Sequence, residues 1–468
     1  MQAIHHQSQK KYCFISCSSL QFQAASSAFF PFANENDLHL QLGRCKILAI
    51  KFLLLSLTML VNKGEKTVLQ RSIIFTAGLV FIGSIAPALA SASAAVDAAE
   101  LEALEKRLNS QQKQIDSLAT ALEKASTSSH NNGFSSGKTQ VSGYAEIHYN
   151  NLENQVNDAD SKAIDIHRFV LEFSHQFSDE LSFFSELEVE HGVAGEGQAG
   201  EVELEQAFIQ WQYLPAHHFL AGVMLVPAGI LNETHEPNTF YGVERNNVEK
   251  NIIPSTWWEA GIGASGELSD SISYQALVSS GLKLESGDYK IRDGRQKASE
   301  ADASELAYTF AINYRGLPGL TVGGTLQHQA DLLQGANISG ARDVSANLIS
   351  AHLDYQRGSV GIRAVYALWD IDSDIELLAA SAAGADEQQG HYIEPSYKIT
   401  EKFGIFARFS QWDNNAGSSI DSEYQQVDVG ANYWLHENVA LKIDLQNQHA
   451  PTGKKELDGF NLGLGLSF

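Results

Sequence analysis

Apolar and polar positions alternate along most of the chain from residue 139 onward. One face of the segment 459–468 carries only apolar side chains, those of Phe460, Leu462, Leu464, Leu466 and Phe468. The other face carries Asn461, Gly463, Gly465 and Ser467. Because successive side chains of a β-strand point to opposite faces, this period of two predicts strands with one apolar and one polar face.

Sixteen segments fit this alternating pattern. They span residues 139–149, 164–177, 181–191, 202–213, 217–226, 257–267, 272–281, 304–315, 320–330, 345–356, 359–369, 389–399, 403–413, 424–435, 438–449 and 459–468. Their mean length is about 11 residues. A tilted strand that crosses a bilayer needs ~9–11 residues, so each segment is long enough to do so.

The connections between these segments alternate in length. Seven are short turns, at residues 178–180, 214–216, 269–271, 317–319, 357–358, 400–402 and 436–437, and the others are longer and polar. Transmembrane barrels have short turns on one side and long loops on the other. Lipid supplies no hydrogen-bond partners, so the sheet must close on itself. The pattern predicts an all-β fold, a 16-stranded antiparallel transmembrane β-barrel over residues 139–468.

Composition narrows the possible partners and chemistry. The chain has 44% hydrophobic and 19% charged residues, which is too polar for a helical membrane protein. Residues 1–92 hold 8 of the 32 basic and 3 of the 56 acidic residues, so the remainder has 24 basic and 53 acidic residues and a net charge of −29. This acidity argues against nucleic acid as a partner. All three cysteines lie before residue 46.

An export signal is predicted at residues 59–92. A basic region with Lys63, Lys66 and Arg71 precedes a short apolar run at 72–85, and small residues near Ala90 offer cleavage sites. These three parts in this order are typical of a secretory signal peptide. The alternative is a transmembrane helix, for which the run is short. We interpret residues 1–58 as an N-terminal extension assigned in error, the alternative being a long leader.

Residues 97–125 follow the heptad pattern of a coiled coil. The apolar seam comprises Leu101, Leu104, Leu108, Ile115, Leu118 and Leu122. Such a seam favours self-association, and a homotrimer would match a trimeric barrel. The alternative is a solvated spacer helix. Residues 126–138 are rich in Ser, Asn and Gly and are predicted to form a linker.

Several stretches resemble the phosphate-selective porin O/P-like family of bacterial trimeric porins. They are VSGYAEIHYNN (141–151), IHRFVLEFSHQFSDELSFFSELEVEHG (166–192), VELEQAFIQW (202–211) and VPAGILNETHEPNTFYGVERNNVEKNIIPSTWWEAG (226–261). The resemblance implies a Gram-negative outer-membrane barrel that contacts lipid and lipopolysaccharide, with the coiled coil in the periplasm. Phe468 resembles the signal that the barrel-assembly machinery reads.

The expected function is passive diffusion of small hydrophilic solutes or ions, without enzymatic activity, catalytic residues or cofactors. Two alternatives remain. One is a phosphate- or anion-selective porin, as the family name suggests, although Arg and Lys are scarce in this chain. The other is a structural anchor that tethers the outer membrane to the cell wall through the coiled coil. The 13 histidines after residue 92 are scattered, so no metal site is expected.

Two groups of charged residues are candidates for lining the lumen. In trimeric porins the connection corresponding to 227–256 folds into the lumen, and here it carries Glu233, His235, Glu236, Glu244 and Arg245. The alternative is an outer loop that packs on the rim. On the strands, the candidates that share the inward face are Arg168, Glu186, Glu188, Glu190, Arg363 and Arg408. They predict either a charge-selective wall with a mild cation preference or an electrostatic ladder between strands.

Overall fold

The computed structural model describes residues 138–157, 159–193 and 200–468. The predicted N-terminal extension, signal peptide, coiled-coil seam and most of the linker lie outside the described residues.

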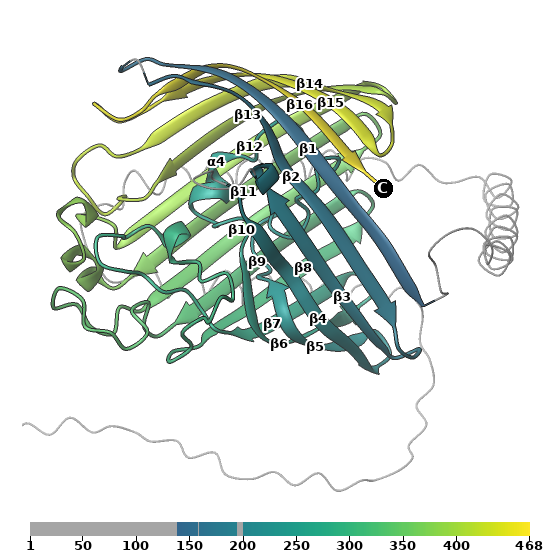
Figure 1. Cartoon of the computed structure of the whole chain (residues 1–468), viewed down its shortest axis with the longest axis horizontal. Coiled ribbons are helices and arrows are strands. Elements are labelled where there is room, and N and C mark those ends of the chain that lie inside the picture. Colours follow the sequence, from purple (N-terminus) through teal and green to yellow (C-terminus); the bar gives the residue numbers. More distant parts are fainter. Residues whose placement is uncertain (1–137, 158, 194–199) are drawn as a thin grey trace, which may run out of the picture. The chain divides into compact units, whose positions relative to one another are not determined.

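Sixteen antiparallel strands form a closed barrel in which each strand pairs with its neighbours in sequence and β1 pairs with β16 (Figure 1). The strands are β1 (Thr139–Asn154), β2 (Ser161–Gln176), β3 (Leu181–Glu190), β4 (Val202–Leu214), β5 (His217–Leu225), β6 (Trp258–Ser269), β7 (Ile272–Ser279), β8 (Ala307–Leu317), β9 (Leu320–Gln329), β10 (Ala346–Arg357), β11 (Val360–Ile371), β12 (Glu387–Thr400), β13 (Phe403–Asp413), β14 (Tyr424–His436), β15 (Val439–His449) and β16 (Leu457–Ser467). The predicted 16-stranded barrel is confirmed, and most strand boundaries agree within three residues.

The polarity of the barrel is inverted relative to that of a water-soluble protein. In β15, Leu441, Ile443 and Leu445 are exposed on the outer surface, whereas Lys442 and Asp444 between them are buried inside. The same alternation runs along β8. An apolar exterior and a polar interior are expected where the outer surface meets lipid.

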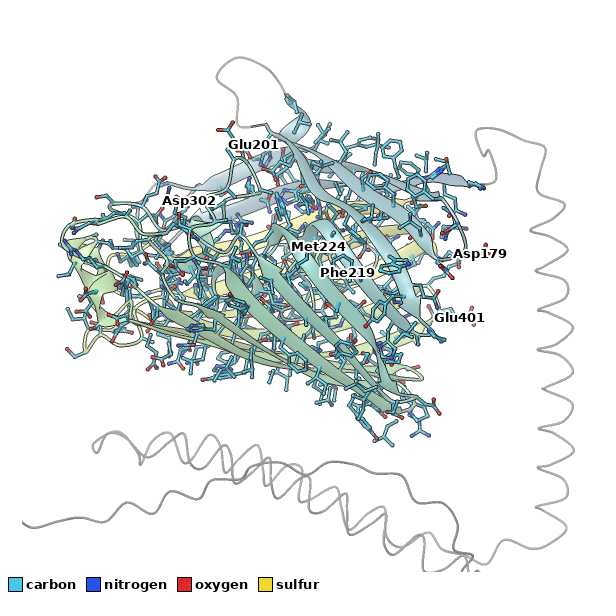
Figure 2. The ribbon with its side chains drawn as sticks, turned by 90° about the horizontal axis from the view of Figure 1, so that it is seen from below. Asp179, Glu201, Phe219, Met224, Asp302 and Glu401 are labelled. Carbon is cyan, nitrogen blue, oxygen red and sulfur yellow. The ribbon has the colours of Figure 1, made fainter. Side chains whose placement is uncertain are left out.

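Short turns and long connections lie at opposite ends of the barrel. Asp179 and Glu401 mark two turns at one end, and Glu201 and Asp302 lie in connections at the other (Figure 2). The long connections contain α4 (Asn247–Asn251) and the 3-10 helices η2 (His191–Val193), η3 (Ile291–Gly294), η4 (Ser373–Leu377) and η5 (Ala380–Ala382). Among residues 138–157, 159–193 and 200–468, no helix is long and apolar enough to cross a bilayer.

Four of the long connections share an apolar core. Buried residues from 226–257, 280–306, 330–345 and 372–386 belong to one hydrophobic cluster, with Trp257, Leu284, Leu332 and Ile375 fully buried. Burial of each such side chain contributes roughly 1.5–3 kcal/mol. This packing holds the connections against one another and against the barrel wall.

Phe468 completes the junction between β1 and β16. Its backbone N–H donates to Gly143 O at 2.9 Å, and its carbonyl accepts from Gly143 N–H at 3.0 Å. A Cβ on Gly143 would lie 2.9 Å from the Phe468 ring. That ring stacks at 6.3 Å from Phe169, on the apolar exterior.

We predict that Phe468→Ala lowers the yield of assembled barrel, because the ring that covers the β1–β16 junction is lost. Heat-dependent gel mobility of outer-membrane fractions measures the folded amount. Ile420→Ala, which changes an exposed side chain on an outer connection, serves as the control. Equal yields for the two variants would contradict the prediction.

Candidate functional site

The segment 227–256 between β5 and β6 crosses the barrel interior. It begins beside β9, where Pro227 O accepts a hydrogen bond from Thr325 Oγ1 at 2.6 Å. Farther along, Val243 N–H donates to Asp444 Oδ2 on β15 at 2.7 Å, and Asn238 Nδ2 donates to Ser467 Oγ on β16 at 2.7 Å. Strands β15 and β16 are far from β5 and β6 around the barrel, so the segment reaches the opposite wall through the lumen.

A buried carboxylate organises this segment from within. Glu249 Oε1 accepts from the backbone N–H groups of Ile230 and Leu231 at 2.5 and 2.7 Å. Its Oε2 accepts from Asn246 Nδ2 at 2.9 Å and from Tyr392 Oη on β12 at 3.0 Å. Four donors on one fully buried carboxylate stabilise a compact fold of the segment and attach it to the wall.

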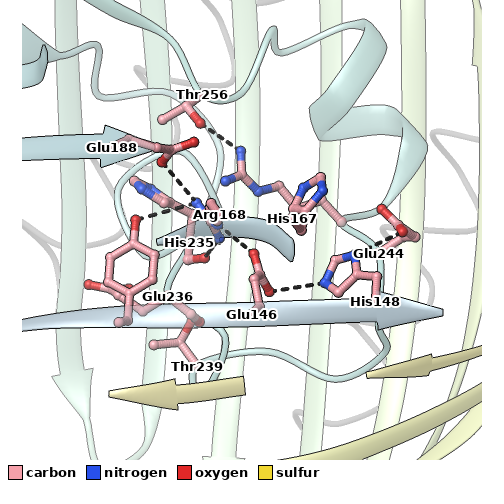
Figure 3. A network of polar contacts seen from close by, with 12 residues as sticks. Glu146, His148, His167, Arg168, Glu188, His235, Glu236, Thr239, Glu244 and Thr256 are labelled. Carbon is pink, nitrogen blue, oxygen red and sulfur yellow. Dashed lines mark hydrogen bonds and ion pairs between the residues drawn. The ribbon is translucent and has the colours of Figure 1, made fainter. Parts of the chain in front are cut away.

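Arg168 joins the segment to the wall formed by β1–β4 (Figure 3). Its Nε lies 2.5 Å from Glu146 Oε1, and its Nη1 lies 3.8 Å from Glu188 Oε2. A third bond runs from Nη2 to the backbone oxygen of His235 at 2.5 Å. The guanidinium and both carboxylates are almost completely buried, so this network is shielded from solutes.

His235 forms a second attachment to the same wall. Its Nε2 lies 3.4 Å from Glu205 Oε2 and 3.7 Å from Glu186 Oε1, and all three side chains are buried. Burial alone would lower the pKa of the imidazole, but the two carboxylates outweigh that effect and raise the pKa to about 9. A protonated His235 at neutral pH therefore holds the segment against β3 and β4.

The predicted residues of the opposite wall are also paired. Arg408 contacts Asp428 Oδ2 at 2.9 Å and Glu394 Oε2 at 3.2 Å. Arg363 contacts Asp354 Oδ2 at 3.1 Å. Both arginines face the interior, and each lies against one or two carboxylates. Their net contribution to the potential of the lumen is correspondingly small.

The remaining predicted residues are more accessible. Glu233 is exposed and accepts a hydrogen bond from Gln275 at 2.8 Å, and Glu190, Glu236, Glu244 and Arg245 are partly exposed. Glu244 lies 3.0 Å from His148 Nδ1 on β1.

The structure brings together a group of cations that the sequence did not predict. Arg292 and Arg295 come from the connection 280–306 and lie near Arg245 and Lys250. Burial, together with the positive charges of Arg295 and Arg245, lowers the pKa of Arg292 to about 9. Within the described part of the chain, none of these four cations has a carboxylate within ion-pair distance. We call them the arginine cluster. No periodicity marks residues that meet only through the packing of two connections.

The sequence also did not predict several buried residues of the wall that take part in these contacts. Tyr144 Oη donates to Glu186 at 2.8 Å, and Glu146 and Glu205 complete the ion pairs described above. Alternation along β1 would have identified Tyr144 and Glu146, which share the inward face with His148. Alternation would not have identified Glu205, because this residue lies at an irregularity in the pairing of β3 with β4.

Comparisons with known proteins agree with this architecture. Residues 85–452 match the family model described as Gram-negative porin. The chain is 34% identical over 332 residues to an uncharacterized protein of Aquifex aeolicus (strain VF5), covering 65% of this chain and 74% of that protein.

Two solved structures share the fold. The anion-selective porin from Comamonas acidovorans matches with a TM-score of 0.51 and 12% identity, over 70% of this chain and 99% of that one. The outer membrane channel DcaP of Acinetobacter baumannii matches with a TM-score of 0.50 and 12% identity, over 72% and 100% of the two chains. From its barrel, its charged interior and the family match, the chain belongs to the Gram-negative porin family and is a non-enzymatic outer-membrane channel for passive diffusion.

Proposed function

We propose that the channel passes small hydrophilic solutes and ions with a mild preference for cations. The observation that carries this proposal is the excess of carboxylates over basic side chains on the wall, together with the exposed carboxylates of the crossing segment. Strands β1–β4 contain nine carboxylates and two basic side chains, Lys162 and Arg168. An excess of one sign in a narrow aqueous path raises the local concentration of the opposite sign.

Exposure separates the carboxylates that solutes meet from those that hold the protein together. Glu186 and Glu188 are buried and bonded within the wall. Glu233, Glu236 and Glu244 lie on the segment that crosses the lumen and are at least partly exposed. We therefore assign the mild cation preference mainly to these three residues, with Glu186 and Glu188 supporting the segment behind them.

The arginine cluster favours a second candidate function. Arg245, Arg292 and Arg295 are close together and partly exposed, and unpaired guanidinium groups attract phosphate and other anions. This arrangement would suit the phosphate- or anion-selective alternative. We rank it second because the carboxylates of the wall and the crossing segment outnumber these cations.

Reversal potentials in a potassium chloride gradient across a planar bilayer measure the preference. We expect the wild-type channel to favour potassium over chloride by about two-fold, given partial neutralisation of the lumen. Glu233→Gln with Glu236→Gln should shift the reversal potential toward chloride. Arg292→Gln with Arg295→Gln should shift it toward potassium. A wild-type preference for chloride, or block of chloride current by inorganic phosphate, would support the second candidate instead.

We further propose that the mature protein is a homotrimer set in outer-membrane lipid and lipopolysaccharide. The support is the heptad seam in residues 97–125 and the apolar exterior of the barrel. Replacing Leu104, Leu108, Ile115 and Leu118 with Ser should weaken the trimer and leave the barrel folded, because strands β1–β16 close the barrel among themselves. Crosslinking of the native membrane distinguishes trimer from monomer. Monomer alone in the wild type would refute the proposal.

The pKa of His235 leads to a pH dependence of channel stability. The folded pKa of about 9 lies above the ordinary value of 6.5, so the stabilisation is complete below 6.5 and is lost as the pH rises through about 9. We expect open-channel current noise to increase over that range. His235→Asn should be noisy already at neutral pH and should lack this pH response. His328→Asn, which alters an exposed histidine on β9, should behave as wild type. Identical pH profiles for wild type and His235→Asn would rule out this role.

A further inference from the structure

A cluster of histidines and carboxylates lies beside the Arg168 network, to its right in Figure 3, where β1 and β2 meet the crossing segment. His148 comes from β1, His167 from β2 and Glu244 from the segment 227–256. One ligand atom from each lies within 4.8 Å of the other two. We propose that these three side chains bind one divalent transition-metal ion of the zinc class.

A β-bulge creates this arrangement. Glu146 pairs with Arg168 and Ile147 with Ile166, so His167 is an extra residue in β2 with no partner in β1. An extra residue in one strand breaks the alternation and redirects its side chain. As a result, the His167 ring stacks on that of His148, with centroids 4.4 Å apart and an interplanar angle of 14°.

One nitrogen of each imidazole lies near a carboxylate oxygen outside the three proposed ligands. His148 Nδ1 lies 3.0 Å from Glu244 Oε1, while its Nε2 lies 3.3 Å from Glu146 Oε2. His167 Nδ1 lies 3.6 Å from Asp165 Oδ2, an ion-pair distance, and the same oxygen lies 2.7 Å from His191 Nδ1. A carboxylate that accepts from the second nitrogen orients a metal-binding histidine and makes it more basic.

The donor set selects the kind of metal. Two imidazoles and one carboxylate are typical of zinc sites that keep a fourth position for water, whereas calcium and magnesium prefer oxygen ligands alone. Zinc bonds of ~2.0–2.2 Å place tetrahedral ligand atoms about 3.3 Å apart. His148 Nδ1 and Glu244 Oε1 are already 3.0 Å apart, so binding mainly requires the stacked His167 ring to tilt and bring its nitrogen toward them, from a separation of at most 4.8 Å.

The site is accessible from the lumen. His167 and Glu244 are 31% and 34% exposed, while His148 behind them is 4% exposed. A bound ion would also connect the crossing segment to the wall, through Glu244 on one side and the two histidines on the other. This inference concerns binding and does not depend on the ion preference of the channel.

Zinc binding to the purified full-length channel in detergent, without a histidine tag, tests the proposal by isothermal titration calorimetry. We expect one zinc ion per chain, and a loss of affinity of roughly tenfold or more in both His167→Ala and Glu244→Gln. His328→Ala, a histidine change elsewhere on the barrel, should bind as wild type. Heat-dependent gel mobility verifies that each variant is folded.

Further measurements identify the ligand set. Cobalt in place of zinc should give the visible absorption of a four-coordinate site, and calcium should not compete. Because His148 is buried, His148→Ala can fail to fold. The variants of His167 and Glu244, which are about one-third exposed, keep the test decisive in that case. The neighbouring group of Asp165, His167 and His191 offers a different set. Unchanged binding in Glu244→Gln, or loss of binding in His191→Ala, would overturn the assignment.

Discussion

Pairing of β1 with β16 is the constraint on which the rest of the structure depends. A strand that meets lipid has no solvent to satisfy its backbone groups, and only a closed sheet pairs them all. The closing pair runs from Tyr144 with Ser467 to Asn154 with Leu457. Closure then requires every strand to turn one face outward and one inward, so the apolar exterior and the charged interior follow from the same geometry.

Burying the charged side chains of the interior costs hydration free energy, and the contacts of the crossing segment reduce this cost. Arg168, Glu146 and Glu188 are buried together, and each would be unfavourable alone because charged groups lose hydration on burial. The segment 227–256 supplies the backbone oxygen and the imidazole of His235 to this group. The same contacts that satisfy the wall position the exposed carboxylates of the segment within the aqueous path.

The lumen is electrically uneven. Carboxylates predominate on β1–β4, and the arginine cluster lies on two inner connections. Several of these carboxylates, among them Glu146, Glu186 and Glu188, are buried and held by neighbouring polar side chains. On the remaining wall, Arg408 forms ion pairs with Asp428 and Glu394.

The sequence by itself determined the number of strands and, away from bulges, which side chains of each strand face inward, and it suggested a candidate role for residues 227–256. Alternation is a local property, so Glu186 and Glu188 could be assigned to the interior without knowledge of their partners. Tertiary structure alone decided the partners. His167 points inward only because a bulge shifts the pairing of β2 with β1, and Glu205 lies at a similar irregularity between β3 and β4. Arg292 and Arg295 approach Arg245 only through packing of two connections. Bulges and loop packing depend on contacts between distant residues, and no local period records them.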